Sequence, residues 1–119
     1  MLLNYGKQYV ALFLAGSANV YPNYFMLGSG SGTAVATQTA LIAPWDRQAV
    51  TGTNGSTVYK VTWQGDWNSV EISGLQLREF AMAGSASALA GSIWSRTALP
   101  NLIFDGTNEL RIEETWVVY

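Results

Sequence analysis

Residues 59–67 read YKVTWQGDW, and they decide the fold class because large apolar and polar residues alternate along them. Tyr59, Val61, Trp63 and Trp67 occupy odd positions, whereas the even positions hold Lys, Thr, Gln and Asp. Successive side chains of a strand point to opposite faces of its sheet, so this pattern predicts a strand with one buried face. We therefore expect Trp63 and Trp67 to lie in a core.

The C-terminal stretch 110–119 shows the same alternation, and its inward row also contains Trp116 and is interrupted only by Glu114. Further strands are expected at Tyr24–Leu27, Ala34–Ile42, Ser69–Ile72 and Gly91–Arg96. Glycine-rich turn signals occur at Gly28–Gly32, Gly52–Ser56, Gly84–Ser87 and Asp105–Asn108. Short strands separated by such turns predict a mainly β chain, an antiparallel β-sandwich of jelly-roll-like or barrel-like form.

A further strand, Leu75–Met82, contains an irregularity. Its apolar residues are odd-numbered up to Leu77 and even-numbered from Phe80 onward. A bulge near Arg78–Glu79 explains this switch, because one extra residue in a strand reverses the faces beyond it.

The first sixteen residues favour a short helix that Asn4 caps and Gly16 ends. The residues that share its apolar face are Tyr5, Tyr9, Leu12 and Phe13. A signal peptide is the alternative, since Lys7 is followed by an apolar run and then by small residues. The apolar run, however, has only the minimum length that a signal peptide needs. No stretch approaches the 18 apolar residues of a membrane-spanning helix, so we expect no membrane association.

Composition narrows the function. The 119 residues show no repeat or linker, so residues 1–119 are expected to form one domain. The absence of Cys and His excludes thiol chemistry, disulfides, Ser-His-Asp triads and the usual zinc sites, and we expect a protein that is not an enzyme and has no cofactor. Six scattered basic residues and a net charge of −2 argue against nucleic acid as a partner.

The chain is poor in charge and rich in apolar residues. Charged residues make up 12% and hydrophobic residues 49% of it, and it has five Trp and six Tyr. Either Ser, Thr, Asn, Gln and Gly cover its surface, or part of that surface is buried in a permanent assembly. We favour the assembly.

The stretch 26–41, MLGSGSGTAVATQTAL, suggests a phosphate-binding loop at first sight. Such loops need a Lys, and no Lys or Arg occurs between Lys7 and Arg47. A dinucleotide fingerprint needs a third glycine where Thr33 stands. The stretch is instead predicted to be a turn that faces solvent or another subunit and binds no anion.

Two sets of residues suggest sugar chemistry. Asp66 and Glu71 flank a predicted turn near Trp63 and Trp67, where a glycosidase-type carboxylate pair is conceivable, although solvated carboxylates at strand ends are the favoured interpretation. The aromatic residues expected in exposed loops, beside Pro22 and Pro44, are Tyr21, Tyr24 and Trp45. They are the candidate interface residues, either for a partner protein or for a carbohydrate.

A structural ion pair is expected within the set Arg78, Glu79, Arg96 and Arg111. Arg78 and Glu79 are neighbours and so point to opposite faces of a strand, which makes them poor partners for each other. Glu79 is expected to pair across strands with Arg96 or Arg111.

Several short motifs follow one another in a recognisable order. They are LGSGSGT at 27–33, then Thr39, Leu41 and Arg47, LREFAM at 77–82, GSIWSR at 91–96, Pro100 and the closing strand 110–119. With the N-terminal helix, this order resembles a family of small virion proteins of tailed bacteriophages, a pattern also found at the attachment end of some myophage tail fibres. Ala81 stands where that family commonly has Gly.

The resemblance implies a structural role in the virion without catalysis. The chain ends with its last expected strand, which favours a capsid cement or decoration protein over a tail, baseplate or fibre-attachment protein. The family's cement proteins commonly act as trimers, so the implied partners are further copies of the chain, as a homotrimer, and the major capsid protein. The alternative of another class is a carbohydrate-binding β-sandwich module.

Overall fold

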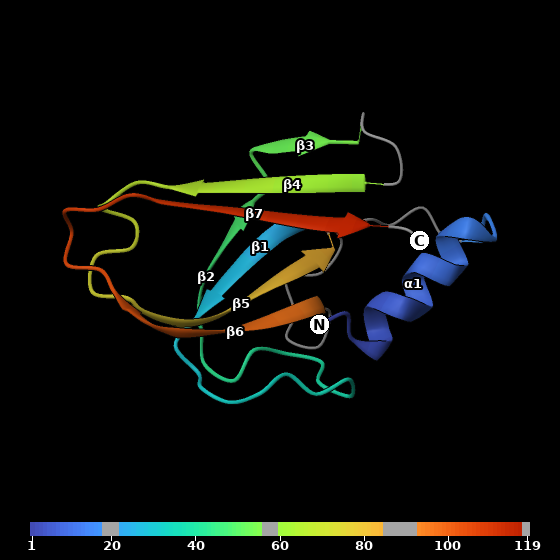
Figure 1. Cartoon of the computed structure of the whole chain (residues 1–119), viewed down its shortest axis with the longest axis horizontal. Coiled ribbons are helices and arrows are strands. Elements are labelled where there is room, and N and C mark those ends of the chain that lie inside the picture. The colour runs from blue at the N-terminus through green and yellow to red at the C-terminus, as the bar shows by residue number, and fades with distance from the viewer. Residues whose placement is uncertain (18–21, 56–59, 85–92, 118–119) are drawn as a thin grey trace.

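The computed structural model describes residues 1–17, 22–55, 60–84 and 93–117. Its elements are α1 (Asn4–Leu14), β1 (Pro22–Gly28), β2 (Pro44–Ala49), β3 (Gly52–Asn54), β4 (Lys60–Trp67), β5 (Gln76–Gly84), β6 (Ile93–Ile103) and β7 (Leu110–Val117). Within these residues the strands form two antiparallel sheets, of order β2-β1-β5-β6 and β3-β4-β7. Figure 1 shows α1 at one end of the molecule. The predicted fold, mainly β and sandwich-like with a short N-terminal helix, is confirmed.

The main core lies between the two sheets. The ring of Phe25 on β1 contacts that of Trp67 on β4 edge to face, with centroids 6.0 Å apart, and lies 6.3 Å from Phe80 on β5. Trp63 and Trp67 are buried, as the alternation of β4 predicted. The other buried members of this cluster are Leu27, Ile72, Leu75, Leu77, Met82, Phe104 and Ile112. Tyr59, which was expected to begin the strand, lies outside the described residues.

The register is irregular near Arg78–Glu79, as expected, but the extra residue expected in this strand is not there. Leu77 lies opposite Leu102 on β6, whereas Glu79 lies opposite Ala98. An advance of two residues along β5 therefore corresponds to an advance of four residues along β6. The additional residues therefore belong to β6 and not to β5. The shift keeps the apolar side chains on both sides of it in the main core and leaves Glu79 buried in the middle of β5.

Two predicted strands are absent. Residues 34–42 form an irregular segment with a turn at Val35–Gln38, closed by a hydrogen bond of 2.9 Å from the Gln38 N–H to the Val35 carbonyl. Residues 69–72 form turns, because Asn68 Oδ1 accepts the N–H groups of Val70 and Glu71. Short polar side chains compete in this way with strand pairing.

Two predicted loops contain strands. Gly52–Asn54 is β3 and pairs with β4, although its composition indicated a turn. Pro44–Ala49 is β2 and places Trp45 on the edge of its sheet. Proline is tolerated there because an edge strand does not need every N–H group for pairing. The predicted turn at Asp105–Asn108 is present, with Gly106 at φ 95°, whereas residues 85–87 of the predicted turn Gly84–Ser87 lie outside the described part.

The helix α1 ends as predicted but begins differently. Gly16 has φ 72° and donates to the Phe13 carbonyl, and Ser17 donates to that of Leu12, which is the Schellman arrangement. Asn4 is the first helical residue and does not cap the helix; the capping position is Leu3. A side-chain cap is dispensable because backbone carbonyls elsewhere in the chain accept the first N–H groups. The N–H of Leu3 donates to the Trp94 carbonyl and the N–H of Asn4 to the Ala36 carbonyl, each over 2.8 Å.

Gly65→Ala tests how tightly the sheets are packed. A Cβ at Gly65 would lie 2.6 Å from Phe25 Cδ2 and 2.9 Å from Trp67 Cη2, so we expect a loss of about 1–3 kcal/mol in the free energy of unfolding. Gly55→Ala is the matched control, because no heavy atom lies within 4 Å of its added Cβ. Urea unfolding measures both variants, and equal stabilities would contradict the packing described.

Candidate functional site

The glycine-rich loop after β1 binds a carboxylate of the protein itself. The N–H groups of Gly30, Ile42 and Ala43 donate to the Glu79 carboxylate over 2.8, 2.9 and 2.9 Å. Gly28 and Gly30 are buried, and a Cβ at either position would collide with the Glu79 side chain. The expectation that the whole stretch faces solvent or another subunit is therefore wrong for these two glycines, because their lack of a side chain lets the loop close over Glu79.

Arg96 completes this arrangement. We call it the clamp; it consists of Glu79, Arg96 and the segment 28–43, which forms hydrogen bonds with both. Arg96 Nε lies 3.0 Å from Glu79 Oε1, and Arg96 Nη1 donates to the Gly32 carbonyl at 2.9 Å. Both charged side chains are fully buried. The predicted pairing of Glu79 with Arg96 is confirmed.

The other two residues of the predicted ion-pair set lie elsewhere. Arg111 pairs with Asp66 across β4 and β7, with Nε 2.7 Å from Oδ1, on an exposed face. Arg78 donates to Gln76 Oε1 at 3.3 Å and forms no ion pair within the described residues. The sequence alone left Arg96 and Arg111 equivalent as partners of Glu79, because strand order decides between them.

The surroundings of Glu79 favour its charged form. Burial on its own raises the pKa of this carboxyl, but the N–H groups of Ala43 and Ile42, the Arg96 guanidinium and the N–H of Gly30 outweigh it and hold the pKa below its ordinary value. The carboxylate is saturated with donors and closed to solvent. The clamp therefore fixes the segment 28–43 onto β5, and the amides of Gly30, Ile42 and Ala43 already bind the carboxylate of Glu79.

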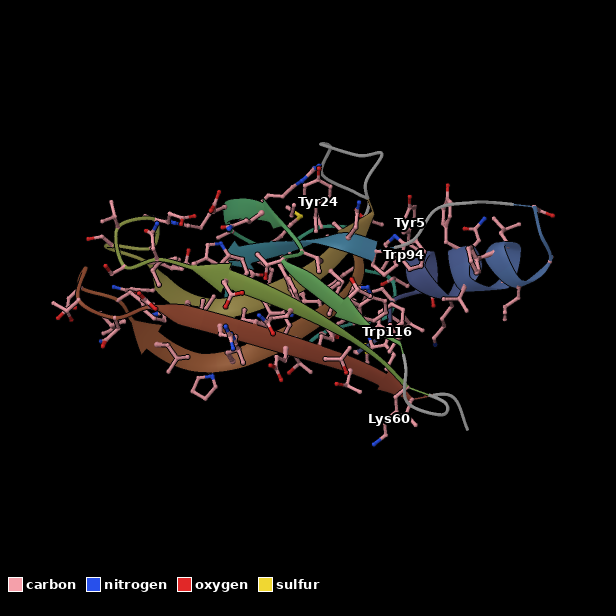
Figure 2. The ribbon with its side chains drawn as sticks, turned by 90° about the horizontal axis from the view of Figure 1, so that it is seen from above. Tyr5, Tyr24, Lys60, Trp94 and Trp116 are labelled. Carbon is pink, nitrogen blue, oxygen red and sulfur yellow. The ribbon has the colours of Figure 1, made fainter. Side chains whose placement is uncertain are left out.

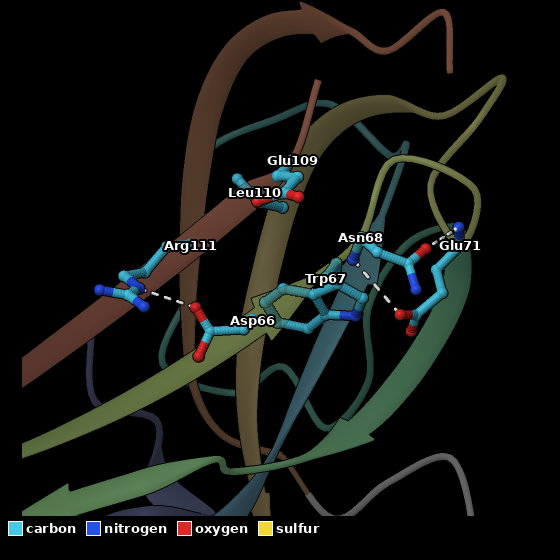
Figure 3. A pocket seen from close by; sticks show the side chains of 7 residues that line it. All are labelled: Asp66, Trp67, Asn68, Glu71, Glu109, Leu110 and Arg111. Atoms are coloured by element: carbon cyan, nitrogen blue, oxygen red, sulfur yellow. Dashed lines mark hydrogen bonds and ion pairs between the residues drawn. The ribbon is translucent and has the colours of Figure 1, made fainter. Parts of the chain in front are cut away.

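The carboxylates considered for sugar chemistry border an open depression of about 460 Å³ (Figure 3). Hydrogen bonds from Thr51, Arg111 and Gln64 lower the pKa of Asp66 to about 2, so this carboxyl is ionised at neutral pH. Glu71 accepts the Asn68 N–H at 3.3 Å. Trp67 is buried and offers no exposed ring face on which a sugar could stack.

The three candidate interface aromatics are not gathered at one place. Tyr24 is half-buried on β1, and the Arg47 guanidinium lies 4.3 Å from its ring centroid, so it is not the exposed loop residue expected. Trp45 is 49% exposed. The register places Tyr24 opposite Ala49, at the other end of β2 from Trp45 and about 13 Å away along the strand. Tyr21 lies outside the described residues.

A row of aromatic rings joins the sandwich to α1 (Figure 2). Ring centroids are separated by 4.7 Å between Trp63 and Trp116, 6.3 Å between Trp116 and Trp94, and 5.8 Å between Trp94 and Tyr9. Tyr5 continues the row at 4.7 Å from Tyr9. Sequence reasoning placed Tyr5 and Tyr9 on one face of the helix but missed Trp94, against which Tyr9 packs, and Phe13 of the same expected face is 49% exposed.

A groove of about 450 Å³ runs between α1 and the C-terminal half of β7. Its lining residues are Met1, Leu2, Val10, Glu114, Thr115, Trp116 and Val117. Glu114 Oε1 accepts hydrogen bonds from Trp116 Nε1 at 3.3 Å and Ser95 Oγ at 3.4 Å, while the buried Oε2 has no partner among the described residues. Burial raises the pKa of Glu114 above its ordinary value. The two hydrogen bonds and the positive charge of the N-terminal amine lower this pKa, but by less than burial raises it.

Within the described ranges, the Asp and Glu side chains form no group of three that could hold a metal ion. In the same part of the chain, no helix has the length and apolar character needed to cross a membrane. Comparison of the chain with protein-family models, curated proteins and solved structures finds no match.

Glu79→Gln tests the clamp. The substitution leaves Arg96 as a buried cation without a counter-charge, so we expect the free energy of unfolding to fall by about 3–5 kcal/mol. Asp66→Asn breaks the exposed pair with Arg111 and serves as the control, with a small expected change because solvent screens that pair. Replacing Glu79 and Arg96 together by Met should cost less than the sum of the single replacements. Equal losses for Glu79→Gln and Asp66→Asn in urea unfolding would contradict the clamp.

The pH dependence of stability provides a second test. Because the pKa of Glu79 is lowered on folding, its contribution is fully present above the ordinary value of 4.5 and is lost as the pH falls through the lowered value. Below pH 4.5 the wild type should lose thermal stability more steeply than Glu79→Gln, which keeps every other carboxylate. Circular dichroism melting across this range measures both slopes, and parallel slopes would refute the assignment.

Proposed function

We propose that this protein is a non-enzymatic structural component of a tailed-phage virion, and by preference a capsid cement or decoration protein. The observation that carries the proposal is where the residues of the phage-like motifs lie. The GSGSGT loop, Glu79 of LREFAM and Arg96 of GSIWSR are far apart in the chain and meet in the clamp. A resemblance is better supported when its motifs meet in one buried cluster than when short matches are scattered over the surface.

The surface of the molecule also favours assembly. Phe13 is 49% and Leu14 80% exposed at the end of α1, and this helix has only one charged side chain, Lys7. Exposed apolar residues grouped on one element mark interaction sites. On a capsid lattice, each subunit of a homotrimer would bridge neighbouring copies of the major capsid protein, so that many modest interfaces together resist internal pressure.

Two other candidates rank lower. A tail, baseplate or fibre-attachment protein fits the same resemblance, and copy number separates it from a cement protein. A carbohydrate-binding module needs several coplanar exposed rings, whereas Tyr24 contacts Arg47 and Trp45 lies at the far end of β2.

Quantitative mass spectrometry of purified virions, together with immunogold labelling, tests the proposal. We expect the protein in particles at a copy number comparable to the capsid lattice, with label on heads. A few copies per particle with label on tails would favour the tail alternative. Absence from particles, combined with binding to an oligosaccharide array, would overturn the virion role.

A further inference from the structure

The aromatic row is continuous from the interior of the sandwich to the surface of α1. Trp63 and Trp94 are buried, Trp116 is half-buried between them, and Tyr9 and Tyr5 are half-buried on the helix. Successive rings have their centroids 4.7 to 6.3 Å apart, which is the range of direct contact between aromatic side chains. Figure 2 shows Trp116, Trp94 and Tyr5 at the junction of the sandwich with α1.

The row consists of tryptophan and tyrosine alone, the aromatic side chains that lose an electron most readily. The phenyl ring of Phe is far harder to oxidise, and electron transfer between two rings slows exponentially as the gap between them widens. Elsewhere in the core, Trp67 contacts Phe25, and Phe25 in turn contacts Phe80. A radical on Trp67 therefore has no onward step through these rings, whereas a radical on Trp116 can pass to Trp94.

The polar surroundings give such a transfer a beginning and an end. Trp116 Nε1 donates to Glu114 Oε1 at 3.3 Å, and this acceptor stabilises positive charge on an oxidised indole. Trp94 Nε1 is buried without a partner among the described residues, so an oxidised Trp94 cannot release its proton and stays a strong oxidant. Tyr9 and Tyr5 are partly exposed, and water can accept a phenolic proton there. Loss of that proton makes the tyrosyl radical the most stable product at neutral pH.

We propose that the row transfers an oxidising equivalent from the tryptophans of the sandwich to Tyr9 and Tyr5. A one-electron oxidant in solution, for which the azide radical serves as the probe, takes an electron from Trp116 and becomes the azide anion. Trp116 regains an electron from Trp94, and Trp94 regains one from Tyr9, whose phenol releases its proton to water. Both indoles are restored, and one tyrosyl radical remains. A soluble reductant of the ascorbate or thiol class then returns the electron and the proton.

The transfer keeps oxidative damage away from the interior. An oxygen atom added to a buried indole has no space in a close-packed core, whereas a tyrosyl radical at the surface is reduced without any change in packing. The inference goes beyond the proposed function and does not depend on it, because it concerns the chemistry of one chain in solution.

Pulse radiolysis with azide radicals tests the transfer. Trp45 is 49% exposed on β2 and would be oxidised as well, so all proteins are made in a Trp45→Phe background. We expect the absorption of the indolyl radical to decay as that of the tyrosyl radical rises, at a rate independent of protein concentration. A rate that increases with protein concentration, or the absence of a tyrosyl radical, would overturn the proposal.

Replacing tyrosine by phenylalanine identifies the end of the row. The double variant Tyr5→Phe, Tyr9→Phe keeps both rings and removes both phenols, so we expect loss of the tyrosyl signal with a nearly unchanged melting temperature. Tyr24→Phe is the matched control, because Tyr24 is also half-buried but packs against Arg47 on β1. Transfer of equal rate and yield in the two variants would show that the row is packing only.

Trp94→Phe interrupts the row in its middle. The smaller ring does not carry the radical, so formation of the tyrosyl radical from oxidised Trp116 should be lost. Trp67→Phe removes an equally buried indole outside the row and should leave the transfer intact, since both tryptophans are 2% exposed. Circular dichroism checks that each variant is folded, and the tyrosine variants decide the question if Trp94→Phe is not. A folded Trp94→Phe protein that transfers as fast as Trp67→Phe would refute the path.

Discussion

The buried ion pair of Glu79 and Arg96 constrains the rest of the structure. Two charges removed from water are tolerated only when further hydrogen bonds compensate both of them. Three backbone N–H groups provide this for Glu79, and the Gly32 carbonyl accepts a bond from Nη1 of Arg96, whose buried Nη2 has no partner among the described residues. These three N–H donors and the carbonyl acceptor lie on the segment 28–43, so the stability of the pair depends on this segment lying over β5. The glycines are required because any side chain at Gly30 would occupy the space of the carboxylate.

The parts of the fold that were predictable are those in which local pattern and tertiary environment agree. The alternation in residues 60–67 and 110–117 identified β4 and β7, because one face of each strand is more deeply buried than the other. The change of parity around Arg78–Glu79 located the register shift between β5 and β6, but not the strand that has the additional residues. Pairing Glu79 with a distant arginine was predictable too, since a charge in an otherwise apolar strand needs a partner. Strand order, which selected Arg96, was not.

The parts that were not predictable depend on distant partners. Residues 34–42 have the composition of a strand, yet the Ile42 N–H bonds to a side chain on β5 and the Ala36 carbonyl accepts from Asn4. The same long-range bonds explain why Asn4 is not a cap. The groove is a further example, because nothing local in the sequence brings Val10 near Val117. The signal that was available is Glu114, an acidic residue in the inward row of β7.

The clamp and the helix both depend on one short stretch of β6, residues 94–96. The Arg96 side chain holds the loop, while its backbone exchanges two hydrogen bonds of 3.0 Å with Met1, and the Trp94 carbonyl accepts the Leu3 N–H. A helix of eleven residues is marginal in water by itself, so these anchors, together with the close approach of Gly6 to the Trp94 carbonyl, determine where α1 lies. Any displacement of Arg96 would therefore move both the loop and the base of α1. The same short stretch of β6 thus positions both the loop, through the Arg96 side chain, and the base of α1, through its backbone groups.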